Sequence, residues 1–442
     1  IPNLTWKKPD GTVMVNPLSF VPDNLDYAMV PSYKYVIKSV FKYFSLHNTV
    51  PYLEWLSYPT TALLTARGCT QNCSVCGGSQ FAYNRVCNRT SPAYRSPKTL
   101  VEDVKLITSF SQAPIFILHD IRQAGMSYAR EFFTLLKKEN ISNELIIELF
   151  YPADEAYFQM ISECVPKFSL EVTLETHDPE LRKLNGKFKC SNAEVESTIA
   201  AALKYSCRKI DIFFMSGIPK QTYASVMESM DYCQHLLETF NGDSRLALFI
   251  APLAPFLDPG CLAYEQPEKY GYTKLCNTLE DHRKAAVQPS WKHILSYETD
   301  CMTRDQIVKS TYEAATRLNQ IKFMYGLIPE NVYEDIKFRI TKSLETLDEI
   351  DKIMLIPDES QRKAAMDRLK EKVRDLNNAT ICGEDELKWP IHKRFSNTFS
   401  VAKLVTGLFL EELVWVGRKV LGLKRPEVSP FLNTTNSKPS DK

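Results

Sequence analysis

Short apolar segments recur along the chain and are separated by polar stretches. They occupy residues 61–67, 114–119, 144–150, 168–175, 210–215 and 246–250. Each has the length of a buried strand rather than that of a buried helix. The stretches between them carry apolar residues at helical spacing, at 100–110, 128–138, 155–164, 193–205 and 223–240. This alternation predicts parallel βα units, because parallel neighbours need a crossover connection.

Six βα units fit either a partial (β/α)6 barrel or a doubly wound sheet. Both architectures place the working residues in loops that follow the carboxyl ends of the strands. We predict an α/β fold with a partial (β/α)6 TIM-like barrel and a helical carboxyl-terminal region. The loop after the first apolar segment is then the first place to look for chemistry.

The chain divides into four predicted parts: a lead-in segment, the barrel, a helical carboxyl-terminal region and a polar tail expected to be disordered. Their ranges are 1–57, 58–275, 276–430 and 431–442. A turn at Pro9-Asp10-Gly11 and a short helix at 33–43 are predicted in the lead-in segment. Charged residues at helical spacing over 344–377 predict a solvated helix or helix pair.

Residues 399–423 carry a broad apolar surface that is interrupted by charged side chains, so no membrane span is predicted there. Two interpretations stay open. One is a helix packed on the barrel. The other is an interfacial helix whose apolar face lies in lipid and whose basic end lies on anionic headgroups, which would give peripheral membrane contact.

Charge and the amino terminus narrow the class of protein. Lys+Arg 54 and Asp+Glu 53 leave a net charge of +1, whereas a duplex-binding protein usually has a clear basic excess. No nucleic-acid partner is therefore expected. No basic segment precedes an apolar run, so we recognise no signal peptide and predict a cytoplasmic protein. The sequence begins with Ile1 rather than Met, and we expect it to be a piece of a longer protein.

Cysteine usage points to one loop. A secreted disulfide scaffold is the wrong class for this core-rich chain, and nine of the twelve cysteines are scattered. The other three, Cys69, Cys73 and Cys76, directly follow the first strand, with one glycine before them and two after. Three thiolates at this spacing predict a metal-binding loop. An odd number of ligands leaves one coordination position open, as reactive sites require.

The Cys-x3-Cys-x2-Cys loop after a first barrel strand resembles the signature of the radical S-adenosylmethionine (SAM) superfamily. The resemblance implies that Cys69, Cys73 and Cys76 hold a four-iron, four-sulfur (4Fe-4S) cluster whose remaining iron binds SAM. It implies reductive cleavage of SAM to a 5′-deoxyadenosyl radical and hydrogen abstraction from a substrate that the sequence does not name. It also implies a reductant such as flavodoxin or ferredoxin.

Four further residues match the cofactor site of the family. The resemblance places Gly77 and Gly78 against the methionine amino group of SAM, where close approach tolerates no side chain. It places Glu175 near the ribose and amino group. Gly217 opens a Gly-Ile-Pro turn that resembles the one beside the adenine and ribose, and residues 251–255 match a segment that makes backbone contacts to adenine.

The closest subgroup is the radical SAM enzymes that contain a cobalamin-binding domain. Tyr94-Arg95-Ser96-Pro97 and Asn16-Pro17-Leu18 resemble elements found there. The Asp-x-His-x-x-Gly motif that binds cobalamin in this subgroup is not found. The segment that begins His119-Asp120 is superficially similar, but its residues are in the wrong order. Two interpretations stay open: cobalamin is bound by a domain encoded upstream of Ile1, or this protein does not bind cobalamin.

Several alternatives stay open. The three cysteines could hold structural zinc with Cys87 as the fourth ligand, or the chain could be a non-catalytic scaffold with an iron–sulfur site. An enzyme could carry out cobalamin-dependent methylation or could modify a lipid. Glu175 could be an ordinary barrel carboxylate and His177 a loop cap. Asp120 and Arg122 form either a substrate-binding pair or an internal ion pair.

Overall fold

The computed structural model describes residues 1–27, 60–374 and 381–390, together with residues 406, 410, 413 and 421. Its main sheet has six strands in the order β10-β9-β8-β7-β6-β3, and every neighbouring pair is parallel. The strands are β3 (Thr61–Leu64), β6 (Ile115–Leu118), β7 (Leu145–Leu149), β8 (Phe168–Glu175), β9 (Ile210–Ser216) and β10 (Leu246–Pro252). The predicted α/β fold is confirmed. The order follows the chain without a reversal, as in a barrel and unlike a doubly wound sheet.

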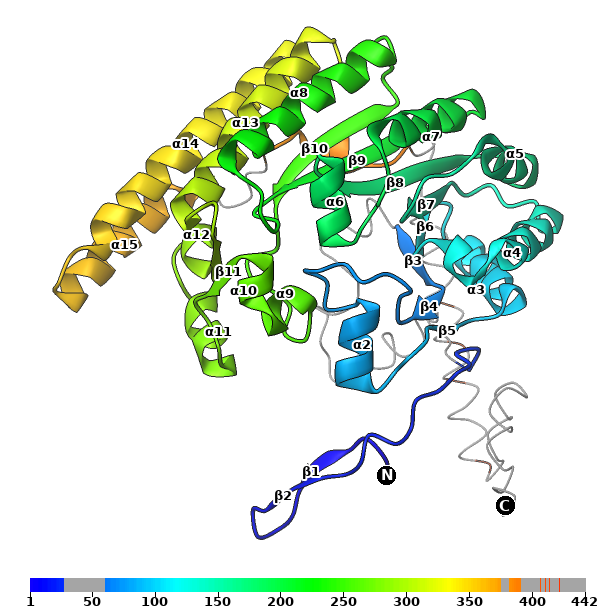
Figure 1. The fold of residues 1–442 in the computed structure, drawn as a ribbon, viewed down its shortest axis with the longest axis horizontal. Helices are drawn as coiled ribbons and strands as arrows, with labels where there is room; N and C mark the ends of the chain where they lie inside the picture. Colours follow the sequence, from blue (N-terminus) through cyan, green and yellow to red (C-terminus); the bar gives the residue numbers. More distant parts are fainter. Residues whose placement is uncertain are drawn as a thin grey trace.

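Helices follow the strands and lie along the outer face of the curved sheet (Figure 1). They are α3 (Pro97–Phe110), α4 (Met126–Lys138), α5 (Glu155–Cys164), α7 (Asn192–Lys204) and α8 (Tyr223–Thr239). Ser96, Asp154, Ser191 and Thr222 cap four of them, each accepting a hydrogen bond from a backbone N–H three residues later. Such caps satisfy N–H groups that the first turn leaves free, so local sequence sets where these helices begin.

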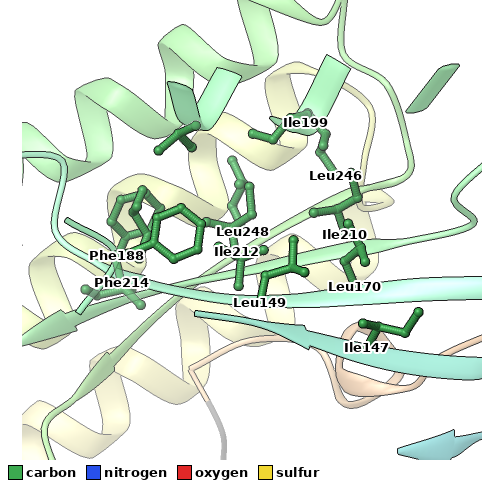
Figure 2. Packing of buried hydrophobic residues seen from close by; sticks show 14 of the residues in the cluster. Ile147, Leu149, Leu170, Phe188, Ile199, Ile210, Ile212, Phe214, Leu246 and Leu248 are labelled. Carbon is green, nitrogen blue, oxygen red and sulfur yellow. The ribbon is translucent and has the colours of Figure 1, made fainter. Parts of the chain in front are cut away.

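Alternate residues of the central strands build the core between sheet and helices. Ile147, Leu149, Leu170, Ile210 and Ile212 are buried in one cluster, as Figure 2 shows. Successive strand residues point to opposite faces, so the residues between them face the inside of the curved sheet. There, Glu148, Glu171 and Asp211 stand side by side, because Glu148 pairs with Glu171 and Glu171 with Asp211 in the strand register.

The described residues 276–374 of the carboxyl-terminal region are mostly helical. α13 (Arg304–Met324) packs against α8 and β10, and α14 (Glu330–Met354) and α15 (Glu359–Lys372) carry most of the predicted charged stretch. In Figure 1, α14 and α15 extend away from the sheet. Smaller elements join the two regions: β11 (Tyr272–Lys274), β12 (Tyr297–Thr299), α9 (Leu262–Glu265), α10 (Pro267–Tyr270), α11 (Leu279–Ala286) and α12 (Trp291–Ile294). The sequence pattern did not predict β11 and β12, which pair with each other.

At the amino terminus, β1 (Thr5–Lys7) and β2 (Val13–Val15) form a hairpin around the predicted turn. The helix predicted at 33–43, most of the apolar stretch 399–423 and the tail 431–442 lie outside the described residues. Within the described part of the chain, no helix has both the length and the hydrophobicity that crossing a bilayer requires.

Candidate functional site

The three clustered cysteines lie in one loop at the carboxyl end of β3. This cysteine loop, residues 68–79, runs from β4 (Ala66–Arg67) to α2 (Gln80–Cys87). Gly68 opens it with a φ of +98°, and a Cβ at this position would lie 3.0 Å from Cδ of Arg89 and 3.1 Å from Cα of Pro92. Only glycine fits this backbone comfortably. Ser79 closes the loop by capping α2.

The thiols of the loop have different surroundings. Cys73 is buried, Cys69 is half-buried and Cys76 is exposed. Burial raises the pKa of Cys73 to about 12. Desolvation of the sulfur also raises the pKa of Cys76, although the residue as a whole is exposed, and the neighbouring thiols contribute less to both shifts. Lys187 opposes both shifts. Cys73 and Cys76 therefore keep their protons at neutral pH until a bound metal displaces them.

Hydrogen bonds reach two of the three sulfurs from close by. The Sγ of Cys76 accepts a bond from the backbone N–H of Gly78 at 3.3 Å. The Sγ of Cys69 accepts one from the backbone N–H of Gln71 at 3.3 Å and one from Nε2 of Gln123 at 3.4 Å. Gln123 comes from η2 (Ile121–Ala124), a short helix directly after β6. Gln123 thus connects the cysteine loop to the segment that follows β6.

The donor set fits an iron–sulfur cluster better than a single zinc ion. Over residues 1–27, 60–374 and 381–390, no three His, Cys, Asp or Glu side chains stand close enough together to hold one metal ion. The thiolates of a cluster bind different iron atoms and need not converge on one point. Lys187 also supplies positive charge beside Cys73 and Cys76, which suits an assembly rich in thiolate and sulfide.

The cysteine loop is held on one side by α6 (Pro179–Asn185). The backbone N–H of Ser74 donates to the carbonyl of Asn185 at 2.7 Å, and the hydroxyl of Ser74 donates to Oδ1 of Asn185 at 3.2 Å. Gly186 follows with a φ of +84°, and a Cβ there would lie 2.4 Å from the carbonyl oxygen of Asn72. Glycine at residue 186 lets the two backbones approach this closely.

The segment after β10 holds the other side of the loop. Asp258 accepts a hydrogen bond from the backbone N–H of Gly77 at 2.8 Å, and the N–H of Ala263 donates to the carbonyl of Ser74 at 2.8 Å. An ion pair of 2.9 Å between Arg85 and Glu265 adds a third link to α2. The loop is therefore fixed from two directions by protein contacts alone.

Glu175 lies at the end of β8 with a φ of +70° and is only 4% exposed. Its Oε2 has no hydrogen-bond partner among the described residues. Burial raises the pKa of Glu175 to about 7, and the charge of Lys187 opposes this shift. A strained, buried and unpartnered carboxylate at the carboxyl end of a barrel strand is the kind of group that a ligand satisfies.

Lys187 links several of the predicted site residues. Its positive charge opposes the upward pKa shifts of Cys73, Cys76 and Glu175. The carbonyl of Gly217 accepts a hydrogen bond of 2.7 Å from the hydroxyl of Tyr272. The roles predicted for Gly77, Gly78, Glu175 and Gly217 toward a cofactor stay predictions.

Other residues considered from the sequence have internal partners. Asp120 is 1% exposed and binds the guanidinium of Arg122, which also donates to the carbonyls of Tyr151 and Pro152 at 2.7 and 2.8 Å. The pair is therefore an internal ion pair. His177 lies 3.0 Å from the hydroxyl of Ser229 on α8.

The Tyr94–Pro97 element also has structural contacts. The hydroxyl of Tyr94 donates to the carbonyl of Gln123, Arg95 forms a buried ion pair with Asp103, and Ser96 and Pro97 begin α3.

The sequence pattern did not single out Gln123, Asn185, Lys187 or Asp258. Gln123 and Asp258 follow the ends of β6 and β10, where the barrel prediction places working residues, and this was the available signal. No local motif marks Asn185 or Lys187. Asn185 meets the cysteine loop only because α6 packs against it, and Lys187 follows that helix.

Comparison with known proteins agrees with the sequence signature. Residues 63–233 match the family model described as the radical SAM superfamily. No curated protein matches this sequence.

Solved structures with similar folds include the radical SAM methyltransferase TsrM from Kitasatospora setae, at 13% identity over 63% of this chain and 52% of that chain, with a TM-score of 0.44. The cobalamin-dependent radical SAM enzyme OxsB matches at 12% identity over 96% and 62%, with a TM-score of 0.44. Coproporphyrinogen III oxidase from Escherichia coli matches at 13% over 73% and 91%, with a TM-score of 0.30. The chain spans between half and two thirds of the TsrM and OxsB chains, and a likeness at this level identifies neither substrate nor product.

Proposed function

We propose that the chain is a radical SAM enzyme in which Cys69, Cys73 and Cys76 bind a 4Fe-4S cluster that cleaves SAM reductively, since residues 63–233 match the radical SAM family model. The observation that carries the proposal is the position of the cysteine loop. It sits at the carboxyl end of β3, is fixed from two sides, and contains the buried thiol of Cys73, whose pKa responds to the charges of Lys187 and Glu175. The carboxyl ends of barrel strands are where catalytic residues gather.

A cluster bound here would supply the electron that breaks the sulfonium carbon–sulfur bond of SAM and so yields a 5′-deoxyadenosyl radical for hydrogen abstraction. The chain contributes charge and position. Glu175 would offer an unpartnered carboxylate oxygen to an amino or hydroxyl group of SAM, and Lys187 would offer a cation to a carboxylate. Gly77 and Gly78 would let the backbone approach SAM closely.

The proposed activity comprises SAM cleavage and hydrogen abstraction. The Tyr94–Pro97 element, which suggested cobalamin, is used to start α3 and to anchor Gln123, so its residues have a structural explanation. The electron donor is proposed to be a small redox protein such as flavodoxin or ferredoxin.

The test is anaerobic reconstitution of the full chain with iron and sulfide, followed by dithionite and SAM, with 5′-deoxyadenosine measured by chromatography. Wild-type protein is expected to form 5′-deoxyadenosine, and Cys73→Ala to fall to background. Cys164→Ala is the matched control, because Cys164 is a half-buried thiol on α5 outside the loop. A wild-type protein that binds zinc and assembles no cluster would refute the proposal.

A further inference from the structure

We propose that Gln123 is a positioning residue that donates an N–H···S hydrogen bond to the Cys69 thiolate and thereby raises the reduction potential of the cluster. This inference rests on the proposed function, since it requires Cys69 to bind iron. The contact is direct: Nε2 of Gln123 lies 3.4 Å from Sγ of Cys69.

The orientation of the Gln123 amide follows from its other partner. Oε1 accepts a hydrogen bond from the backbone N–H of Thr70 at 3.3 Å, and a backbone N–H can only donate. The carbonyl oxygen must therefore face Thr70, which leaves the amide nitrogen for the sulfur. Oε1 is 3.7 Å from the same sulfur, a contact that a protonated thiol can use and a metal-bound thiolate cannot.

Two hydrogen bonds fix the main chain of Gln123. Its backbone N–H donates to the carbonyl of Asp120 at 2.9 Å, and its carbonyl accepts from the hydroxyl of Tyr94 at 3.1 Å. The buried pair of Asp120 and Arg122 fixes the same short helix. The main chain that carries the Gln123 side chain is therefore fixed next to Cys69, as expected of a residue that supports a metal ligand.

Gln123 differs from the other donors to the three sulfurs. In residues 60–374, the described bonds to Cys69 and Cys76 from Gln71 and Gly78 come from the backbone, whereas Gln123 uses its side chain. A substitution of Gln123 can therefore remove this donor without changing the backbone donors, and Gln123→Glu keeps the acceptor for Thr70. Reduction adds negative charge to the cluster and its thiolates, so an N–H donor stabilises the reduced form more than the oxidised form.

The experiment is a redox titration of the reconstituted full chain followed by electron paramagnetic resonance. In Gln123→Leu, the ratio of reduced to oxidised cluster at a fixed potential is expected to fall about 3–10-fold, where tenfold corresponds to about 59 mV for one electron. Gln123→Glu keeps an acceptor for Thr70 but loses the donor and adds a charge, so its potential is expected to be lower still. Gln80→Leu is the control, because Gln80 borders the loop and its side chain contacts Thr90 rather than a sulfur.

Equal potentials in wild-type, Gln123→Leu and Gln123→Glu proteins of full iron content would overturn the inference and leave the proposed function intact. A second readout needs no variant. With ¹⁵N in glutamine side chains, the wild-type cluster is expected to show hyperfine coupling to an amide ¹⁵N, and its absence would also overturn the inference. Failure of the wild-type protein to assemble a cluster would instead refute the proposed function.

Discussion

Gly77 is constrained by a residue from a distant part of the chain. Asp258 accepts the N–H of Gly77, and a Cβ at residue 77 would lie 2.8 Å from both Cβ and Oδ2 of Asp258. Gly77→Ala is therefore expected to displace the cysteine loop, to lower iron content and to destabilise the protein by about 1–3 kcal/mol, as overpacking does. Iron per chain after reconstitution and urea unfolding measure the two effects.

Asp258→Gly supplies the control for that substitution. It removes both the Cβ and the carboxylate that a Cβ at residue 77 would meet, so the double variant Gly77→Ala with Asp258→Gly is expected to bind more iron than Gly77→Ala alone. A double variant no better than the single one would show that glycine is needed for another reason, such as close approach of SAM to the backbone.

Glu171 makes stability depend on pH. It stands between Glu148 and Asp211 in the sheet, and burial together with these two carboxylates raises its pKa to about 7. The folded protein therefore holds a proton that the unfolded chain releases at the ordinary glutamate pKa. The stabilisation is complete below that ordinary value and is lost as the pH rises through about 7.

Glu171→Gln fixes the neutral form and is expected to raise the free energy of unfolding at pH 8 by about 1 kcal/mol, with little change at pH 4.5. The expected change in unfolding free energy is smaller than the raised pKa of Glu171 alone would imply, because solvent screens this half-buried side chain. Urea unfolding of the iron-free chain across this pH range provides the measurement. Glu163→Gln, an exposed position on α5, should leave the pH profile unchanged. Parallel profiles for wild-type and Glu171→Gln proteins would contradict the assignment.

Among the elements, η2 depends on one buried ion pair. Arg122 binds Asp120 and two backbone carbonyls that follow β7, while Asp120 also accepts from the N–H of Phe150. Arg122→Met would leave the Asp120 carboxylate buried without its cation, at an expected cost of about 3–5 kcal/mol. Adding Asp120→Asn removes that charge and is expected to restore part of the loss in urea unfolding. Equal stability of the single and double variants would rule out this account.

The regular elements could be predicted from the sequence because their signals are local. The apolar segments at 145–149 and 168–175 have the length of buried strands, and residues such as Ser191 and Thr222 mark helix starts. β11 and β12 carry no such signal, since each has three residues and depends on the other. Their pairing is a tertiary contact.

The same distinction applies to the candidate site. The cysteines, the glycines and Glu175 belong to recognisable local patterns. The groups that hold them do not, because Asn185 contacts Ser74 across 111 residues and Asp258 contacts Gly77 across 181. Spacing in one sequence cannot specify which distant loops meet, and that knowledge required the packed structure.

On the scale of the whole molecule, a segment far along the chain covers the amino-terminal end of the sheet. Residues 381–390 include η4 (Glu384–Leu387), and the ammonium of Lys209, just before β9, donates to the carbonyls of Glu386 and Lys388. Trp389 stacks on Phe116 of β6 with ring centroids 5.5 Å apart. The segment thus connects two strands at the end opposite the cysteine loop.

Lys322 joins this segment to α13 and provides a test of how it is coupled to the barrel. Its ammonium lies 2.7 Å from Oε2 of Glu386, and Lys322 is only 2% exposed. Lys322→Met and Glu386→Gln each remove one partner, and the buried ammonium left by Glu386→Gln lacks its counter-charge. Each single change is expected to lower the free energy of unfolding, measured in urea, by about 1–3 kcal/mol. The double variant is expected to lose less than the sum of the two, with a coupling energy of about 1–2 kcal/mol.

Hydrogen exchange at residues 381–390 should accelerate in both single variants if this segment detaches before the barrel unfolds. If the two losses of unfolding free energy simply add and the hydrogen-exchange rates do not change, then Lys209 and Trp389 hold the segment on the barrel and the ion pair does not contribute.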